Sequence, residues 1–412
     1  MAIFKPFRAL RPQPIHAKAV ASRPYDVLNT QEAREEADGN KYSFLRVIKP
    51  ELELSDDIDP YGTEVYEQGL KNLNLLRSEN ILQKDAKPSF YIYRLTMNNR
   101  EQTGIVGCCN YQEYFDGHIK KHELTRTAKE NDRVRHVETQ NANAEPVFFS
   151  YRGLDSINEI ISNTTKLSPT YDFVADDGIR HELWTIEHDE AIAQIESEFK
   201  TIPDLYVADG HHRTAAAARV GQQKKEQNLS HDGTEEYNFF MAVLFSDDQL
   251  KIFDYNRVVK DLDGQSKEEF QAKLSEVFEI SESSSGQSPS AKGSFSMYLD
   301  SKWYKLQPRE IVSSPNPKDN LDVTFLSEKV LDPILGIKDL RKDTRIDFVG
   351  GIRGLTELER RVDSGEMKVA FALYPVSMAE LLAIADAGEI MPPKTTWFEP
   401  KLRSGLFIHE LE

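Results

Sequence analysis

Apolar residues recur along the chain with two different periods, which predict short strands mixed with amphipathic helices. In residues 61–83 the apolar positions return every three or four residues, as in a helix with one buried face. Runs of aromatic and branched apolar residues predict strands at 89–95, 102–109, 147–151, 170–175, 182–186, 204–208 and 239–245. Helical patterns occupy 157–161, 189–199 and 214–220. This mixture predicts an α/β protein of the mixed α+β kind.

The pattern starts a second series of elements in the C-terminal part of the chain. A helix predicted at 267–278 runs into a Ser-rich loop, Ser281 to Pro289, and a hairpin follows at 294–306. Further helices and strands alternate beyond this hairpin. The sequence therefore predicts a core with an N-terminal extension in 1–254 and a second α/β region in 255–412. The alternative is that both regions share one core.

The net charge of −17 over 412 residues restricts the kind of partner that the surface favours. An acidic surface repels nucleic acid and anionic lipid, because binding them needs a surplus of Lys and Arg. No apolar run approaches the roughly 20 residues that span a bilayer, and the N-terminus lacks the apolar segment of a signal peptide. The two cysteines, Cys108 and Cys109, are adjacent and make no disulfide framework. A soluble cytoplasmic protein with no nucleic-acid or membrane partner is expected.

The densest chemistry lies where a short apolar strand meets an alanine-rich helix. The strand ends at Asp209, Gly210 permits a tight turn, and His211, His212 and Arg213 follow at once. Amide groups at a helix N-terminus bind phosphate or carboxylate oxygens, and a guanidinium adds a bidentate contact. Cations there oppose the positive end of the helix dipole, and an anionic ligand would remove that conflict. The turn therefore predicts a site for the phosphates of a nucleotide.

Two other interpretations of this turn stay open. Asp209 could simply cap the helix while Gly210 shapes the turn, which leaves the two histidines and the arginine unexplained. Alternatively Asp209, His211 and His212 could hold a metal ion, although adjacent histidines point in different directions on a helix.

The same stretch resembles the signature of a known family. Residues 207–213, Val-Ala-Asp-Gly-His-His-Arg, resemble a motif of a widespread bacterial and archaeal family catalogued as a domain of unknown function. Further stretches that resemble this family are 23–27, 121–125, 129–133, 391–396, Lys401 and 405–406. That family resembles the free serine kinases of the ParB and sulfiredoxin superfamily, in which the equivalent turn holds nucleotide phosphates. The resemblance implies a ParB/sulfiredoxin-like nucleotide-binding core in 1–254.

A charged segment, Lys120 to Arg135, allows two interpretations. Glutamates and arginines at three- and four-residue spacings would form a solvated helix with surface ion pairs. The same residue types serve phosphoryl transfer, where a carboxylate orients a hydroxyl and cations meet the transferring charge. With the resemblance, Glu123 becomes the candidate base and Arg126 a phosphate contact. Substrate or loop contacts are expected from Tyr25, Asp26, Lys129, Asp132, Arg133, Lys394 and Lys401.

Simpler interpretations exist for some of these contacts. Tyr25 and Asp26 would also suit a plain turn, and Lys394 and Lys401 would suit a solvated loop.

The chain has no Gly-x-x-x-x-Gly-Lys-Ser/Thr loop and no protein-kinase signature set. Any kinase activity would therefore use neither of these common scaffolds.

The leading hypothesis is a nucleotide-dependent small-molecule phosphotransferase. Glu123 and Asp209 would be its catalytic residues, and Mg²⁺ would bridge the phosphates of ATP or ADP, with Asp209 as a ligand. The resemblance implies a free amino acid such as serine as the acceptor. The alternatives are a non-catalytic nucleotide-binding regulator and a phosphatase or nucleotide hydrolase. The sequence does not fix the oligomeric state.

Overall fold

The chain folds into two compact units, and each is described by itself. The computed structural model describes residues 2–310 and 313–412. Unit 1 contains the chain up to Leu250 together with Pro400–Glu412, and unit 2 contains Lys251–Glu399. The sequence pattern divides the chain at 254–255, whereas the structure divides it after Leu250 and returns the C-terminal segment to unit 1.

Backbone pairing explains why this segment belongs to unit 1. Leu10 and Ile408 exchange two backbone hydrogen bonds of 2.9 and 3.0 Å, and an isolated bridge joins Ser22 to Ser404. The short strand β21 (His409–Glu410) pairs with β7 (Ala142–Asn143). All these partners lie far apart in the sequence, and hydrophobic periodicity carries no information about such pairing.

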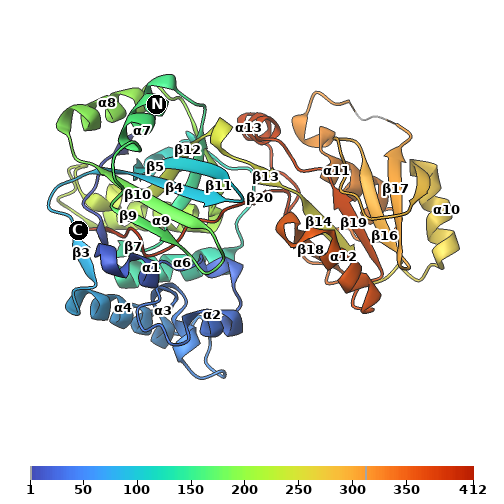
Figure 1. Cartoon of the computed structure of the whole chain (residues 1–412), viewed down its shortest axis with the longest axis horizontal. Coiled ribbons are helices and arrows are strands. Elements are labelled where there is room, and N and C mark those ends of the chain that lie inside the picture. The colour runs from blue at the N-terminus through green and yellow to red at the C-terminus, as the bar shows by residue number, and fades with distance from the viewer. Residues whose placement is uncertain (1, 311–312) are drawn as a thin grey trace. The chain divides into compact units, whose positions relative to one another are not determined.

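A nine-stranded mixed sheet forms the centre of unit 1 (Figure 1). Its strands follow the order β6-β11-β8-β12-β5-β4-β10-β9, and β1 pairs with β5. They are β1 (Phe4–Lys5), β4 (Phe90–Met97), β5 (Arg100–Asn110), β6 (Ile119–Lys120), β8 (Val147–Tyr151), β9 (Tyr171–Val174), β10 (Arg180–Ile186), β11 (Leu205–Asp209) and β12 (Phe239–Ser246). The pairs β6–β11 and β8–β12 are parallel, and the other pairs are antiparallel. This arrangement confirms the mixed α/β class.

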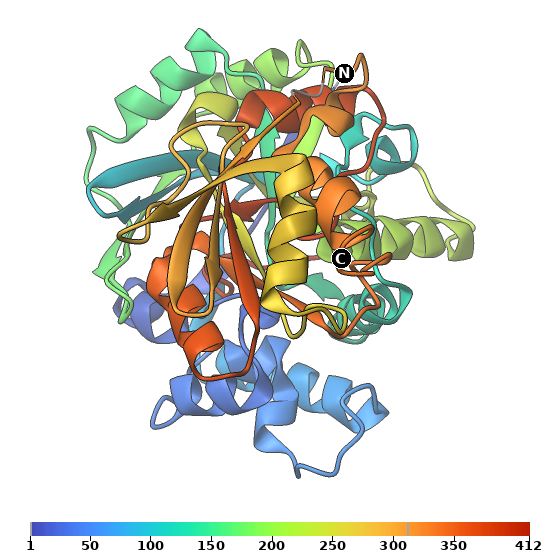
Figure 2. The same ribbon diagram turned by 90° about the vertical axis from the view of Figure 1, so that its right-hand side faces the viewer.

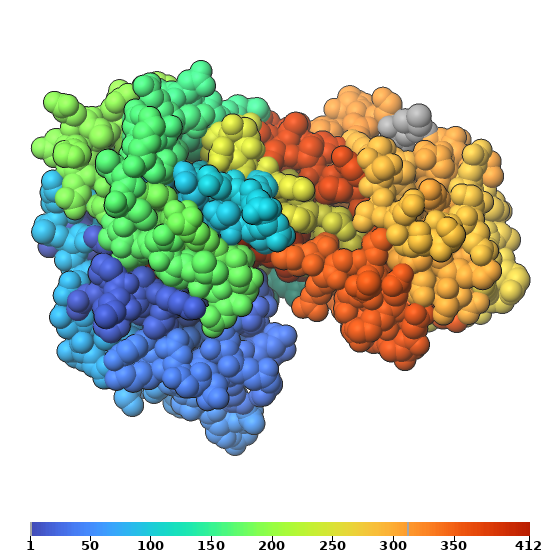
Figure 3. Space-filling view, viewed as in Figure 1, coloured from blue at the N-terminus to red at the C-terminus, as the bar shows by residue number. Residues whose placement is uncertain are grey.

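Helices cover this sheet and extend unit 1 at the N-terminal side. They are α1 (Ala17–Val20), α2 (Thr30–Ala37), α3 (Leu45–Ile48), α4 (Thr63–Ser78), α5 (Gln112–Phe115), α6 (Thr127–Gln140), α7 (Asp155–Thr164), α8 (Asp189–Phe199) and α9 (His211–Gln227). Helix α6 packs against both α4 and α9. A small sheet of β2 (Leu10–Pro12) and β3 (Leu82–Lys84) lies near them. In the space-filling view the N-terminal helices form one end of unit 1, in blue (Figure 3).

The core of unit 1 combines strands that the sequence pattern predicts with β1 and helix α8. Phe4, Phe90 and Phe199 meet there, and the side chains of Cys108 and Cys109 are fully buried. The predicted strands at 89–95 and 102–109 correspond to β4 and β5, which pair as a hairpin. Its turn residues, Asn98 and Asn99, have φ angles of +51° and +62°, which asparagine tolerates better than most residues.

Unit 2 contains an antiparallel sheet of order β15-β17-β16-β19-β14-β18, with α10 and α12 beside it (Figure 2). Its strands are β13 (Ile252–Phe253), β14 (Tyr255–Val259), β15 (Phe278–Ser283), β16 (Phe295–Leu299), β17 (Lys302–Pro308), β18 (Ile346–Gly350), β19 (Val369–Leu373) and β20 (Trp397–Phe398). Its helices are α10 (Lys267–Val277), α11 (Asp322–Leu326), α12 (Gly354–Asp363) and α13 (Met378–Asp386). Helix α12 packs on β16, β18 and β19 over a small apolar core.

Two expectations about helices are corrected by the structure. The charged segment Lys120 to Arg135 is not one helix, because Ile119–Lys120 forms β6 and α6 begins only at Thr127. Residues 121–126 form a loop instead, so the solvated-helix interpretation is wrong for them. Helix α9 starts three residues before the predicted segment 214–220 and continues past it.

Among the described residues, no helix is both long and apolar enough to cross a membrane.

Candidate anion-binding site

The turn between β11 and α9 is a single residue, as short as the sequence predicts. Gly210 adopts φ +89° and ψ +33°, a left-handed conformation that other residues rarely adopt. Gly210 is also the N-cap of α9, and as a glycine it makes no side-chain hydrogen bond that would cap this helix. The interpretation in which Asp209 caps α9 is therefore wrong. The first amide groups of the helix have no acceptor within the helix and are suited to a ligand.

Arg213 is buried at 6% exposure and faces back towards the turn. Its Nη1 donates to the carbonyl oxygen of Pro146 at 2.7 Å, and its Nη2 lies 3.5 Å from Oδ2 of Asp209. Its Nε is buried without a hydrogen-bond partner among the described residues. A Cβ at Gly210 would lie only 3.1 Å from this Nε, so glycine is needed both for the turn and for the guanidinium.

Asp209 stands between two cations. Nζ of Lys401 and Nη2 of Arg213 lie 3.4 and 3.5 Å from its Oδ2. Burial raises the pKa of the Asp209 carboxyl, but the charges of Lys401 and Arg213 outweigh that effect and hold its pKa well below the ordinary value. Asp209 is therefore ionised, and one carboxylate keeps two cations within reach of the α9 N-terminus.

The two histidines of the motif are held neutral. Burial lowers the pKa of His211 to about 4, and burial also lowers the pKa of His212, with the charge of Lys129 acting in the same direction. The backbone amide of Arg126 donates to Nε2 of His212 at 2.9 Å, so the neutral ring carries its proton on Nδ1. Nε2 of His211 is buried and has no hydrogen-bond partner among the described residues.

The loop 121–126 and the turn η2 (Tyr25–Val27) both bring a carboxylate to the start of α9. The carboxylates of Glu123 and Asp26 both oppose the lowering of the pKa of His212. Burial lowers the pKa of Arg213, but Asp26 is the strongest of several acidic neighbours that raise it above its ordinary value. Glu123 is half-buried and Asp26 is exposed. The structure thus brings together carboxylates and cations from segments that are far apart in the sequence, such as Asp26 and Arg213.

The remaining predicted residues fall into three groups. Asp132 and Arg133 are buried in α6 and pair with each other at 2.6 Å. Lys129 and the side chain of Arg126 are exposed beside His212. Lys394 belongs to unit 2, where its Nζ lies 5.8 Å from the centroid of the Tyr255 ring.

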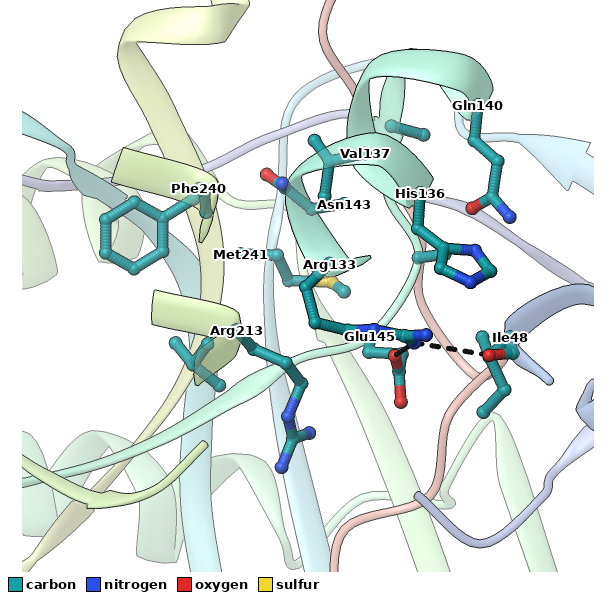
Figure 4. A pocket seen from close by; sticks show the side chains of 14 residues that line it. Ile48, Arg133, His136, Val137, Gln140, Asn143, Glu145, Arg213, Phe240 and Met241 are labelled. Carbon is teal, nitrogen blue, oxygen red and sulfur yellow. Dashed lines mark hydrogen bonds and ion pairs between the residues drawn. The ribbon is translucent and has the colours of Figure 1, made fainter. Parts of the chain in front are cut away.

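Three residues near the motif are absent from the sequence prediction. Glu145 and Arg213 line the same small cavity, shown in Figure 4. The rings of His122 and His211 make a T-shaped contact, with their centroids 4.5 Å apart. Burial lowers the pKa of His122 to about 3. Ser404 donates to Glu145 at 3.4 Å. Single polar residues before a strand or in a loop carry no sequence pattern, so only the family stretch around 121–125 pointed towards any of them.

The donor set of this site suits an anion better than a metal ion. Among the described residues, no group of three or more histidine, cysteine or acidic side chains could hold a metal. Asp209 already has Lys401 and Arg213 as partners, and a divalent cation on its carboxylate would have to compete with both. A buried guanidinium nitrogen and uncapped helix amides, in contrast, match the oxygens of a phosphate.

Fold and site together define a mixed α/β protein in which a glycine turn leads into a helix whose first turn carries a buried arginine. Residues 4–324 match the family model described as a protein of unknown function, DUF1015, and the chain belongs to this family. This confirms the family resemblance of the motif at 207–213. Among curated proteins, none matches the sequence.

Three solved structures resemble this chain at low identity. A conserved hypothetical protein from Pyrococcus furiosus is 13% identical, with a TM-score of 0.35 over 73% of this chain and 93% of that chain. A free serine kinase in complex with AMP is 13% identical, with a TM-score of 0.36 over 72% and 90%. SbnI with a C-terminal truncation, from Staphylococcus aureus, is 10% identical, with a TM-score of 0.38 over 73% and 85%. Similarity at this level identifies no functional residue of this chain.

Proposed function

We propose that unit 1 binds the phosphates of a nucleotide at the start of α9 and transfers a phosphoryl group to a small-molecule acceptor. The observation that carries this proposal is a pair of buried nitrogens, Nε2 of His211 and Nε of Arg213. They have no hydrogen-bond partner among the described residues, although they flank an uncapped helix N-terminus. Buried polar atoms without partners are costly, and phosphate oxygens would satisfy them.

In the proposed phosphate site, the helix amides, Arg213, Gly210 and Asp209 would have different roles. The amides at the start of α9 and the guanidinium of Arg213 would bind phosphate oxygens, and Gly210 lets the ligand approach the backbone. Asp209 would hold Lys401 and Arg213 in place before the ligand arrives. With the histidines neutral, Lys401 and Arg213 would supply positive charge at the helix start. The choice of ATP or ADP among phosphate compounds follows the resemblance of residues 207–213 to the serine kinase turn.

Glu123 is the proposed base on the acceptor side. The loop that contains Glu123 is fixed to α9 by the hydrogen bond from the backbone amide of Arg126 to Nε2 of His212. The charge of the Glu123 carboxylate also opposes the lowering of the pKa of His212. In this role Glu123 would accept the proton of the acceptor hydroxyl while that oxygen bonds to the terminal phosphorus. The bond from this phosphorus to the bridging oxygen of the nucleotide breaks. The products are a phosphorylated acceptor and a nucleotide with one phosphate fewer.

Mg²⁺, bound with the nucleotide, would neutralise phosphate charge. Asp209 is a poor ligand for it while Lys401 and Arg213 hold the carboxylate, so the proposal leaves Mg²⁺ on the phosphates. A free amino acid such as serine is the acceptor that the family resemblance suggests. No step of the proposal depends on that choice.

A turnover assay with ATP or ADP, with and without candidate acceptors, tests this function. Turnover that requires an acceptor supports the phosphotransferase. Turnover without an acceptor would assign a nucleotide hydrolase to the same site, and calorimetric binding without turnover would assign a regulator. Absence of both binding and turnover for every nucleotide would overturn the proposal.

A further inference from the structure

Glu145 is a buried carboxylate for which the proposed chemistry has no use. It lies between β7 and β8, and its side chain is 7% exposed. Its Oε1 accepts hydrogen bonds from the backbone amide of Tyr25 and from the hydroxyl of Ser404, both at 3.4 Å. Its Oε2 accepts from Nη1 of Arg133 at 3.2 Å. One carboxylate therefore contacts three segments that are distant in the sequence.

Arg133 continues this network on the other side of Tyr25. Its guanidinium carbon lies 3.8 Å from the centroid of the Tyr25 ring, which is cation–π geometry. The same guanidinium binds Asp132 through Nε and Nη2 and donates to the carbonyl oxygen of Ile48. Figure 4 shows Arg133 joined to Glu145. Tyr25 is thus held at its ring by Arg133 and at its backbone by Glu145.

The cavity at this place is lined by Arg133, Glu145 and Arg213. Both carboxylate oxygens of Glu145 already accept hydrogen bonds from protein donors there. Burial raises the pKa of Glu145, and the charges of Arg133 and Arg213 oppose that shift. A buried carboxylate whose two oxygens are both engaged by protein donors acts on the protein itself.

Both segments that Glu145 holds carry a charged residue to the anion site. Asp26, which follows Tyr25, is the acidic group that raises the pKa of Arg213 most. Lys401, three residues before Ser404, pairs with Asp209. Asp26 itself is exposed, so its place depends on how the turn is held.

We propose that Glu145 is a positioning residue that fixes the turn Tyr25–Val27 and the segment around Ser404, and thereby presents Asp26 and Lys401 to the phosphate site. The effect on ligand binding rests on the proposed function, whereas the effect on the two segments does not. Glu145→Gln tests both, because it keeps the size and one acceptor oxygen but removes the charge that faces Arg133. Glu159→Gln is the matched control, since Glu159 is exposed in α7.

Hydrogen exchange of the full chain is the first readout. In Glu145→Gln we expect amides 25–28 and 402–405 to exchange at least about tenfold faster, while the central strands of unit 1 keep their protection. In Glu159→Gln both segments should exchange as in the wild type. Unchanged exchange of both segments in Glu145→Gln would overturn the proposal, and so would equally faster exchange throughout unit 1.

Calorimetric titration with ADP is the second readout. We expect Glu145→Gln to weaken ADP binding by about tenfold, similar to the loss of metal affinity when a residue that supports a metal ligand is mutated. If the wild type binds no ADP, the proposed function fails, and hydrogen exchange alone decides the role of Glu145. If Glu145→Gln does not fold, Arg133→Lys replaces it: loss of the planar guanidinium over Tyr25 should speed exchange at 25–28. Unchanged exchange in that variant would contradict the network.

Discussion

Helices α9 of unit 1 and α10 of unit 2 begin in opposite ways. At α10, the hydroxyl of Ser266 accepts from the amide of Glu269 at 3.2 Å, and the Glu269 carboxylate accepts from the amide of Ser266 at 2.8 Å. This is a capping box, and Glu268 adds a second acid to the first turn. Helix α9 has Gly210 as N-cap, no side-chain cap, and no acid in its first turn.

The two helix starts differ in whether their first amide groups already have hydrogen-bond acceptors. The α10 start satisfies its own amides and adds negative charge at the positive end of the helix dipole, so it needs nothing further. The α9 start leaves its amides available and adds an arginine where a cation is unfavourable. A helix start with these properties is stabilised by an external anion.

The largest effect is expected from the carboxylate beside the open helix start. Glu123→Gln keeps the size of the side chain but removes its charge, and we expect turnover to fall by about 10²–10⁴-fold with little change in nucleotide affinity. Glu269→Gln, the same change beside the closed helix start, should leave turnover unchanged. Steady-state kinetics and calorimetry on both variants measure this. A fully active Glu123→Gln enzyme would move the base to Asp26 or Asp209.

The second prediction concerns the cation in the first turn. Arg213→Ala should weaken nucleotide or phosphate binding by about 1.5–3 kcal/mol, the scale of a hydrogen bond to a charged group. Lys267→Ala removes a first-turn cation from α10 and should change binding by less than the error of the titration. Calorimetric titration with ADP and with inorganic phosphate measures both. Equal affinities of Arg213→Ala and the wild type would remove Arg213 from the site.

The third prediction concerns pH. His211 has a pKa of about 4 in the folded chain and about 6.5 when unfolded, so the unfolded chain binds more protons between these values. The free energy of unfolding should therefore be highest above pH 6.5 and fall towards pH 4, by up to about 1.4 kcal/mol per pH unit for this residue. His211→Gln should lose that part of the slope, whereas His188→Gln, at an exposed position, should keep it. Urea unfolding between pH 4 and 7 measures the difference, and identical slopes in wild type and His211→Gln would contradict a neutral buried His211.

The smallest effect compares the two N-caps directly. Ser266→Ala should cost about 1 kcal/mol of stability and leave ligand binding unchanged, because only the cap is lost. Gly210→Ala should cost a similar amount through its positive φ, but should also weaken phosphate binding, since the added Cβ would lie 3.1 Å from Nε of Arg213. Thermal melts and titrations of both variants test this. If both variants bind phosphate like the wild type, Gly210 has only a backbone role.

The features that sequence predicted well are local ones. The hairpin at Asn98 and Asn99 and the strand–glycine–helix turn at Gly210 each depend on a few neighbouring residues, and their residue types restrict the backbone directly. The period of apolar residues also located most strands of the central sheet, because each strand must bury one or both faces. These features are settled before any tertiary contact is known.

Features that depend on distant contacts were not predictable in the same way. The spacing of charges in 121–126 suits a helix, yet the Arg126 amide binds His212 and the segment forms a loop. The pairing of Lys401 with Asp209 joins a loop to the end of strand β11, and the lysine taken alone indicates only a solvated loop. Glu145 had no sequence signal, because its importance comes from Tyr25, Arg133 and Ser404 meeting around it.

The return of the C-terminal segment to unit 1 has a consequence for biosynthesis. The ribosome completes Asp209 and Arg213 well before it reaches Lys401, and all of unit 2 is translated in between. At roughly 5–20 residues per second, unit 2 alone takes on the order of ten seconds. During that interval the nascent unit 1 has the phosphate turn but lacks the lysine that pairs with Asp209 and the strand β21 that pairs with β7. A nascent chain stalled within unit 2 should therefore carry an incomplete site, and nucleotide binding should appear only after the last segment leaves the exit tunnel.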